Sequence, residues 1–125
     1  DQLADFVIQN HIQGTLIQCM YFVPGTPVYE ANRDRLLHQD WSKYNGNAVH
    51  FPRRMTPYQL QLEHIRASRK IYSWRRLFSA LVREDPIHKV LFLGEFFWHM
   101  SVRSDLKREL PYLKRISEQA ACAPH

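Results

Sequence analysis

The side chains that most often catalyse reactions or bind metals are scattered along this chain and form none of the common motifs. No two histidines stand four residues apart, so a zinc site on one helix face is not predicted. The two cysteines, Cys19 and Cys122, form neither a CxxC pair nor a disulfide framework. The chain also lacks a P-loop, a GxGxxG sequence and a GxSxG elbow. We therefore expect no catalytic residue and no metal ligand that acts within this chain alone.

A Pro-Gly-Thr-Pro turn is the feature most typical of a ligand site. Residues 15–23, which precede it, are rich in β-branched and aromatic residues and predict a short buried strand. Pro24 cannot donate to a sheet ladder, and Gly25 permits a positive φ or the close approach of a ligand. Thr26 is suited to cap the helix that Pro27 would begin. Open α/β folds and β/α barrels place ligands at such strand ends, although a plain tight turn explains the local pattern better.

Helices are expected on both sides of this strand. Leu3, Phe6 and Val7 have helical spacing and predict a helix over residues 1–12 with one buried face. A short helix is expected over residues 26–38. The order helix, strand, helix is one unit of a parallel α/β architecture. A parallel strand needs a neighbouring strand, however, and the sequence offers no second strong one.

The second part of the chain is predicted to be helical. A capping box that starts at Thr56 predicts a long helix over residues 57–84. An apolar helix over 86–102 should follow, because this segment carries few charges on any side. A basic helix is expected over 105–120, and Pro111 should kink or restart it.

These elements predict a fold that is mainly α with a small β component. Residues 1–51 would form a helix–strand–loop unit, in which 48–51 is a brief extended piece, and residues 52–125 a helical extension. The chain begins at Asp1, without Met, inside an expected helix. We therefore expect it to be part of a longer protein.

The composition is that of a folded domain, since 45% of the 125 residues are hydrophobic and 13% are aromatic. The net charge of +5 permits contact with nucleic acid, an anionic membrane surface or a phosphate-bearing cofactor. A basic helical face in solvent explains this charge better, and nucleic acid is not the expected partner. Two isolated cysteines suit a reducing compartment, which predicts a cytoplasmic protein.

Four blocks of sequence occur in one order along the first two-thirds of the chain. They are VPGTPVYE at 23–30, LLHQDWSKYNG at 36–46, PRRMTPYQLQ at 52–61 and IYSWRR at 71–76. In this order and spacing they resemble the C-terminal part of radical S-adenosylmethionine enzymes, of the group that often carries an N-terminal cobalamin-binding domain. The resemblance implies an iron–sulfur oxidoreductase or methyltransferase that acts on a small molecule of unknown type.

The chain departs from this family at three places. Tyr21 and Phe22 stand where the family has Thr-Pro, and Asn45 replaces an Asp. The Cys-x-x-x-Cys-x-x-Cys loop, which in the family holds the [4Fe–4S] cluster that binds S-adenosylmethionine, is missing. Three thiolates are needed for such a cluster, and this chain has two distant cysteines. We therefore expect the chain to be inactive alone, to bind no cofactor alone and to need the remainder of its parent.

The resemblance also assigns places to the first elements. Residues 1–12 would be the last helix, and residues 15–23 the last strand, of a partial TIM-type barrel. The Pro-Gly-Thr-Pro turn would then lie at the carboxyl-terminal mouth of the barrel, beside S-adenosylmethionine and the substrate. The expected cofactor-binding residues, through backbone approach and a hydroxyl hydrogen bond, are Pro24, Gly25 and Thr26. The expected substrate-lining residues are Tyr21, Arg53 and Arg54.

Two other functions remain open from the sequence. The basic and aromatic stretch over residues 66–76 could bind RNA or another polyanion. The apolar stretch over residues 90–100 could form an oligomer interface or contact a membrane surface. A core helix explains the second stretch better.

Overall fold

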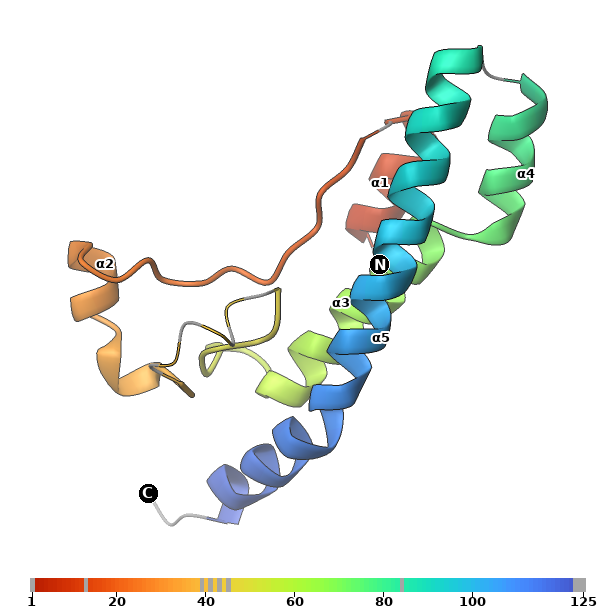
Figure 1. Cartoon of the computed structure of the whole chain (residues 1–125). Helices are drawn as coiled ribbons and strands as arrows, with labels where there is room; N and C mark the ends of the chain where they lie inside the picture. Colours follow the sequence, from red (N-terminus) through yellow and green to blue (C-terminus); the bar gives the residue numbers. More distant parts are fainter. Residues whose placement is uncertain are drawn as a thin grey trace. The chain divides into compact units, whose positions relative to one another are not determined.

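The computed structural model describes residues 2–12, 14–38, 40, 42, 44, 46–83 and 85–122, and it is mainly helical (Figure 1). The fold class predicted from the sequence is therefore confirmed in its α part. The helices are α1 (Gln2–Gln9), α2 (Pro27–Glu30), the 3₁₀ helix η1 (Arg33–Arg35), α3 (Pro57–Ile71), α4 (Trp74–Arg83) and α5 (Pro86–Cys122).

Contacts divide the chain into two compact units. Unit 1 comprises residues 1–17 and 63–107, and unit 2 comprises residues 18–62 and 108–125. The helices α3 and α5 contribute to both units. The division expected at residue 51, between a barrel part and an extension, stays a prediction.

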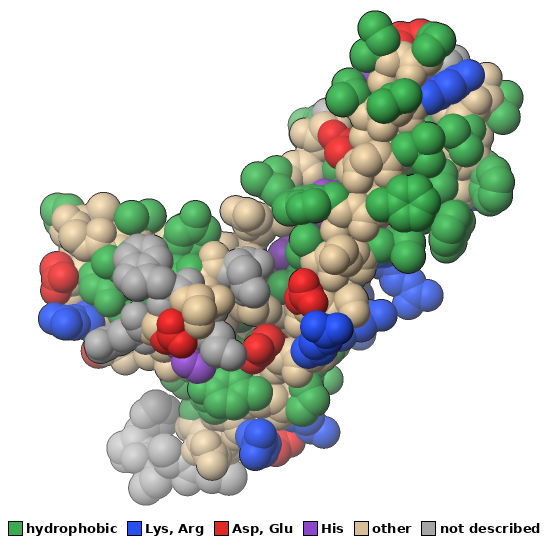
Figure 2. All heavy atoms as spheres, viewed as in Figure 1, with side chains coloured by type: hydrophobic (Ala, Val, Ile, Leu, Met, Phe, Trp, Pro, Cys, Tyr) green, Lys and Arg blue, Asp and Glu red, His purple; other side chains and the backbone are tan. Residues whose placement is uncertain are grey.

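Unit 1 exposes many large apolar side chains. Figure 2 shows hydrophobic side chains gathered over α4 and the amino-terminal half of α5. Those more than half exposed on these two helices are Trp74, Phe78, Val82, Ile87, Val90, Leu91 and Phe97. Soluble monomers rarely expose so many apolar side chains together.

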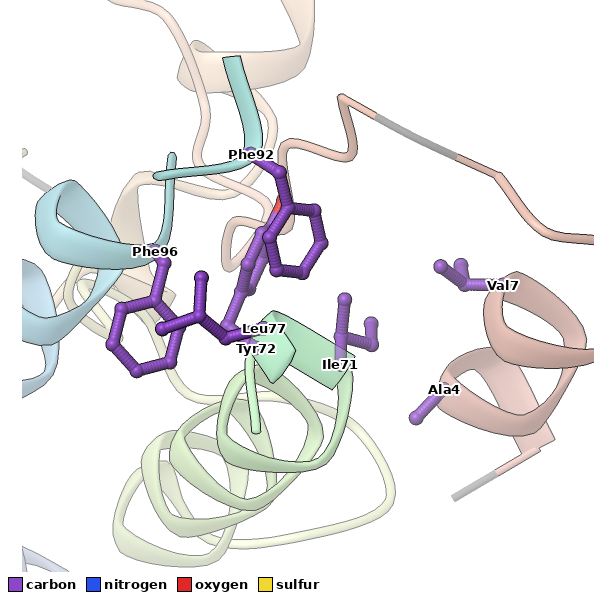
Figure 3. Close-up of a cluster of buried hydrophobic side chains, with 7 residues drawn as sticks. All are labelled: Ala4, Val7, Ile71, Tyr72, Leu77, Phe92 and Phe96. Carbon is purple, nitrogen blue, oxygen red and sulfur yellow. The ribbon is translucent and has the colours of Figure 1, made fainter. Parts of the chain in front are cut away.

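A small core holds unit 1 together (Figure 3). Ala4 and Val7 of α1 belong to the same buried cluster as side chains from α3, α4 and α5. The helix predicted over residues 1–12 forms over Gln2–Gln9, and Val7 is buried as expected, but two other residues of the expected face are not. Leu3 and Phe6 are each 56% exposed. The small Ala4 lets α1 approach the core along the Ala4–Val7 stripe, one position away from the larger side chains. The other members of the cluster are Ile71, Tyr72, Leu77, Phe92 and Phe96.

The prediction of a single helix over residues 57–84 is wrong, because the helix is interrupted between α3 and α4. The Tyr72 hydroxyl donates to the Thr15 carbonyl oxygen at 2.7 Å, and the ring is 2% exposed. Arg76 then donates from Nη1 to the Ile71 carbonyl oxygen at 3.0 Å, which caps the end of α3. The amino-terminal start of α3 is as predicted. Thr56 and Gln59 exchange two side chain–backbone hydrogen bonds in a capping box, at 2.9 and 3.2 Å.

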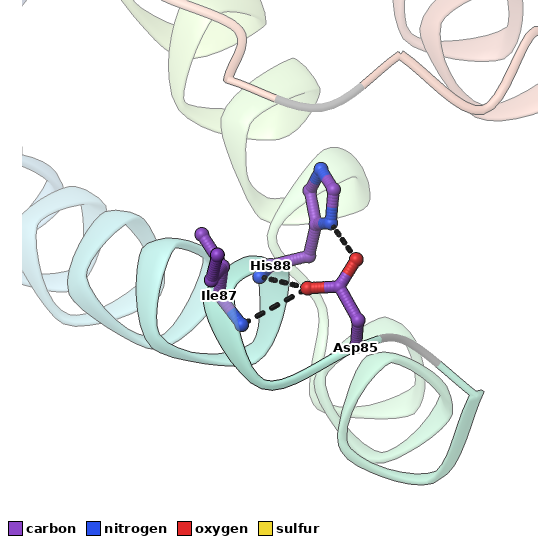
Figure 4. Close-up of polar contacts among 3 residues, drawn as sticks. All are labelled: Asp85, Ile87 and His88. Carbon is purple, nitrogen blue, oxygen red and sulfur yellow. Dashed lines mark hydrogen bonds and ion pairs between the residues drawn. The ribbon is translucent and has the colours of Figure 1, made fainter.

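The two helices predicted over 86–102 and 105–120 are instead one helix, α5, which continues through Pro111. No glycine or proline lies between the predicted helices, and Ser104 sits inside the helix instead of capping one. Asp85 caps the start of α5. Asp85 accepts the backbone N–H groups of Ile87 and His88 at 3.0 and 3.1 Å and pairs with the His88 ring at 2.5 Å (Figure 4). The backbone hydrogen bond from His88 is the main reason that the pKa of Asp85 is lowered.

Residues 15–23 form neither a strand nor a helix, so the predicted strand is not formed in this chain. Its neighbouring strand is missing from the described residues, and side chains satisfy part of its backbone instead. Within unit 1, His64 Nε2 lies 2.9 Å from the Ile17 carbonyl oxygen, and Tyr72 bonds to Thr15. The assignment of this segment to a barrel stays a proposal.

The small β component is an isolated bridge between Leu36 and His50 in unit 2. The Leu37 N–H donates to the Val49 carbonyl at 2.9 Å, and the Phe51 N–H donates to the Arg35 carbonyl at 2.8 Å. The brief extended piece predicted at 48–51 is therefore confirmed. This bridge brings the residues after η1 beside the residues before Pro52.

Candidate functional site

The Pro-Gly-Thr-Pro turn has the geometry that its residues predict. The Val23 carbonyl oxygen accepts the Thr26 N–H at 3.2 Å, and Gly25 has a φ of +80°. Proline followed by a glycine of positive φ is typical of a type II turn. Thr26 then caps α2, whose first residue is Pro27. The predicted positive φ, cap and helix start are all confirmed.

The hydroxyl of Thr26 is largely committed to the turn. It donates to the Val23 carbonyl oxygen at 2.6 Å and accepts the Tyr29 N–H at 3.2 Å. Its single proton is therefore engaged, and a ligand could use only the remaining acceptor lone pair. The sequence alone predicted a hydroxyl hydrogen bond to a ligand without this constraint.

Gly25 leaves open space beside the turn. A Cβ added at this position would meet no atom within 4 Å. Within this chain, therefore, glycine is favoured here because of the φ of +80°, and not because a larger side chain would clash with a neighbour. The open space leaves the backbone of the turn accessible to a ligand.

A hollow of about 390 Å³ lies in unit 2, near the residues that precede the turn. Its lining is partly apolar and, among the described residues, includes two arginines and no carboxylate. The lining residues are Met20, Phe22, Asn32, Arg35, His50, Pro52 and Arg53. A volume of this size is within the range of small-molecule sites.

Arg35 is held in place at this hollow by two hydrogen bonds. Its Nη1 donates to Asn32 Oδ1 at 3.0 Å, and its Nη2 donates to the Phe51 carbonyl oxygen at 2.6 Å. Arg53 has no hydrogen bond or ion pair to any described residue and is exposed. Among the described residues of the lining, the charged side chains are the two arginines, so the lining favours a negatively charged ligand.

His50 is the buried titratable residue of the hollow. It is 4% exposed, and its ring centre lies 5.0 Å from that of Phe22. Burial first, and then the charge of Arg35, lowers the pKa of His50, so the imidazole is neutral at pH 7. Its Nδ1 atom is buried and has no hydrogen-bond partner among the described residues.

The structure separates the site residues that were predicted together. Arg53 lines the hollow, whereas the exposed Arg54 does not. Tyr21, which is 38% exposed, packs edge-to-face on Tyr44 at 5.9 Å and is not in the lining. The turn residues Pro24, Gly25 and Thr26 also lie outside the lining.

Sequence reasoning missed three polar residues of the hollow, Asn32, Arg35 and His50. None belongs to a recognisable motif. Arg35 and His50 come to one hollow through the pairing of residues 35–37 with the extended piece at 48–51, for which the sequence carries no local signal.

Two curated methyltransferases of Chlorobaculum tepidum are similar to this chain. The bacteriochlorophyllide d C-12(1)-methyltransferase is 29% identical over 91 residues, which are 72% of this chain and 20% of that protein. The bacteriochlorophyllide d C-8(2)-methyltransferase is 30% identical over 80 residues, which are 62% of this chain and 18% of that protein. The chain thus spans about a fifth of the length of these relatives. No family model and no solved structure matches it.

This similarity supports a methyltransferase relationship for part of the chain, which is one of the two reaction classes that the sequence blocks imply. The sequence identity is low, and the similar segment is about a fifth of the length of either relative. The activity of a whole protein is therefore taken up as a proposal below.

The described residues do not fit a [4Fe–4S] cluster. Cys19 is buried, and desolvation raises the pKa of its thiol to about 11, which disfavours the thiolate that iron requires. In the part of the chain that the structure describes, no three His, Cys, Asp or Glu side chains are placed to share a metal ion. Nor does any described helix combine the length and apolar character needed to cross a membrane.

Proposed function

We propose that this chain is the C-terminal part of a radical S-adenosylmethionine methyltransferase and contributes its ligand-facing turn. The similarity to two methyltransferases carries this proposal, because it agrees with the four ordered sequence blocks. The parent would hold the [4Fe–4S] cluster, and in this group often cobalamin, on residues outside this chain. Such a parent would act in the cytoplasm on a small organic substrate.

The role of the turn in this proposal is positioning. Gly25, next to Pro24, presents backbone in open space, and the cap made by Thr26 fixes the direction in which α2 leaves the turn. A ligand beside this turn would meet backbone groups and the free lone pair of Thr26, and it would find no group suited to proton transfer. The turn would therefore bind S-adenosylmethionine and orient it without taking part in the chemistry.

Binding of S-adenosylmethionine to the parent protein tests this proposal. The sharpest variant is Gly25→Ala, and Gly46→Ala is its matched control, since Gly46 has a φ of +95° and the same open surroundings. Both substitutions should cost about 1 kcal/mol of stability, because alanine is strained at positive φ. Calorimetric titration should show weaker binding for Gly25→Ala alone.

Two results would contradict the proposal. The first is a parent protein that does not bind S-adenosylmethionine at all. The second is equal affinity in the wild type and both glycine variants, which would leave the turn with a purely structural role.

A further inference from the structure

We propose that the hollow of unit 2 binds the acidic group of an amphipathic organic anion, a carboxylate attached to an apolar ring system. The inference rests on the proposed function only where it identifies this anion as the substrate of the parent enzyme. The hollow and its charges are properties of this chain alone.

The charges of the lining favour an anion. Arg35 and Arg53 both line the hollow, and no described residue of the lining is a carboxylate that would neutralise them. Arg35 uses one N–H on Asn32 and one on Phe51, so its remaining N–H groups have no acceptor among the described residues. Because those two bonds already fix the guanidinium, little side-chain entropy is lost when an anion binds.

The rest of the lining favours an apolar body on the same ligand. Met20 is 69% exposed beside the hollow, and Pro52 adds a second apolar wall. Phe22 and His50 form an aromatic pair at the same site. A volume of about 390 Å³ accommodates a ring-sized group with one acidic arm.

The buried Nδ1 atom of His50 is an independent sign that a polar partner is missing. A buried polar atom without a hydrogen bond costs about 1–3 kcal/mol, so such atoms are rare in folded proteins. His50 lines the hollow and is neutral at pH 7, so one polar atom of a ligand could complete its hydrogen bonds without bringing two positive charges together. A carboxylate would serve the two arginines, and an imidazole with its proton on Nδ1 would donate to it once the ring exposes that buried atom.

Titration of the 125-residue chain with 2-naphthoate tests the proposal. The uncharged 2-naphthamide and inorganic phosphate serve as comparison ligands, because each carries only one of the two features. Two-dimensional amide NMR should show shifts concentrated in residues 20–22, 32–35 and 50–53 with 2-naphthoate, and binding should weaken as salt is raised. The two comparison ligands should bind at least about tenfold more weakly.

Arg53→Gln is the variant of choice, because this exposed side chain has no hydrogen bond or ion pair to the described residues. It should weaken 2-naphthoate binding about tenfold, and Arg53→Lys should weaken it less. Arg33→Gln is the matched control. It removes the same charge from η1, where Arg33 pairs with Glu30 at 3.6 Å outside the hollow, and should leave the affinity within about twofold.

Equal binding of the acid and its amide, shifts outside the hollow, or equal losses in Arg53→Gln and Arg33→Gln would overturn the proposal. These measurements need neither a cluster nor S-adenosylmethionine, so they can fail while the proposed function stands. In the opposite case, a parent without S-adenosylmethionine binding would remove the enzyme assignment and leave the anion site intact.

Discussion

His99 is a buried histidine whose surroundings oppose its protonation. It is 4% exposed, and its ring stacks on that of Tyr72 with 3.9 Å between the centres. Burial, followed by the charge of Arg103, lowers the pKa of His99 to about 4, although a hydrogen bond to the Thr15 backbone acts in the opposite direction. The folded chain therefore keeps this imidazole neutral at pH values where an unfolded chain would protonate it.

This difference predicts a pH-dependent stability. Between the unfolded pKa of about 6.5 and the folded value of about 4, the unfolded state binds more protons, so stability falls as the pH falls. Across this pH interval, the free energy of unfolding should fall by at most about 3 kcal/mol. Urea unfolding at several pH values should show this slope.

The matched variants for this prediction are His99→Gln and His11→Asn. The first should reduce the slope, and part of what remains should come from His50, whose pKa is also lowered by burial. The second replaces an exposed histidine with a residue that tolerates its φ of +52°, and it should leave the slope unchanged. The same slope in all three proteins would contradict the assignment to His99.

Single residues of the hollow were only partly predictable from the sequence. Arg53 stands in a motif and was identified, but its neighbour Arg54 carries the same local signal and lies outside the lining. Arg35 and His50 become neighbours only through the bridge between Leu36 and His50. No local pattern encodes that pairing, so sequence reasoning could not have found it.

At the scale of elements, local chemistry predicted where helices begin better than where they end. The caps at Thr26, Thr56 and Asp85 were all recognisable because a cap depends on residues within one turn. The break between α3 and α4 depends on Tyr72 reaching Thr15, which lies far away in sequence. The strand predicted over residues 15–23 was not formed for a similar reason, since a strand depends on a neighbour.

The capping box of α3 makes a prediction about one element. Thr56→Ala removes the hydroxyl that accepts the Gln59 N–H, and it should lower the free energy of unfolding by about 1 kcal/mol. Thr56→Ser keeps the hydroxyl and should cost less. Chemical unfolding measures both, and equal losses in the two variants would show that the methyl group, not the cap, is what matters.

At the scale of the whole molecule, the chain leaves apolar surface uncovered on α4 and α5 (Figure 2). The chain divides into two compact units, and the buried cluster described above belongs to unit 1. Under the proposed function, this apolar surface would be covered where the chain packs against the remainder of a larger enzyme. The proposed role of this chain therefore depends on its parent, and the parent is the right object for the decisive test.

That test is the chemistry of the parent protein, purified without oxygen and supplied with iron and sulfide. The proposed function predicts a bound, reducible [4Fe–4S] cluster and, after reduction, cleavage of S-adenosylmethionine to 5′-deoxyadenosine detected by chromatography. A parent that lacks the three-cysteine loop, assembles no cluster and leaves S-adenosylmethionine intact would contradict it.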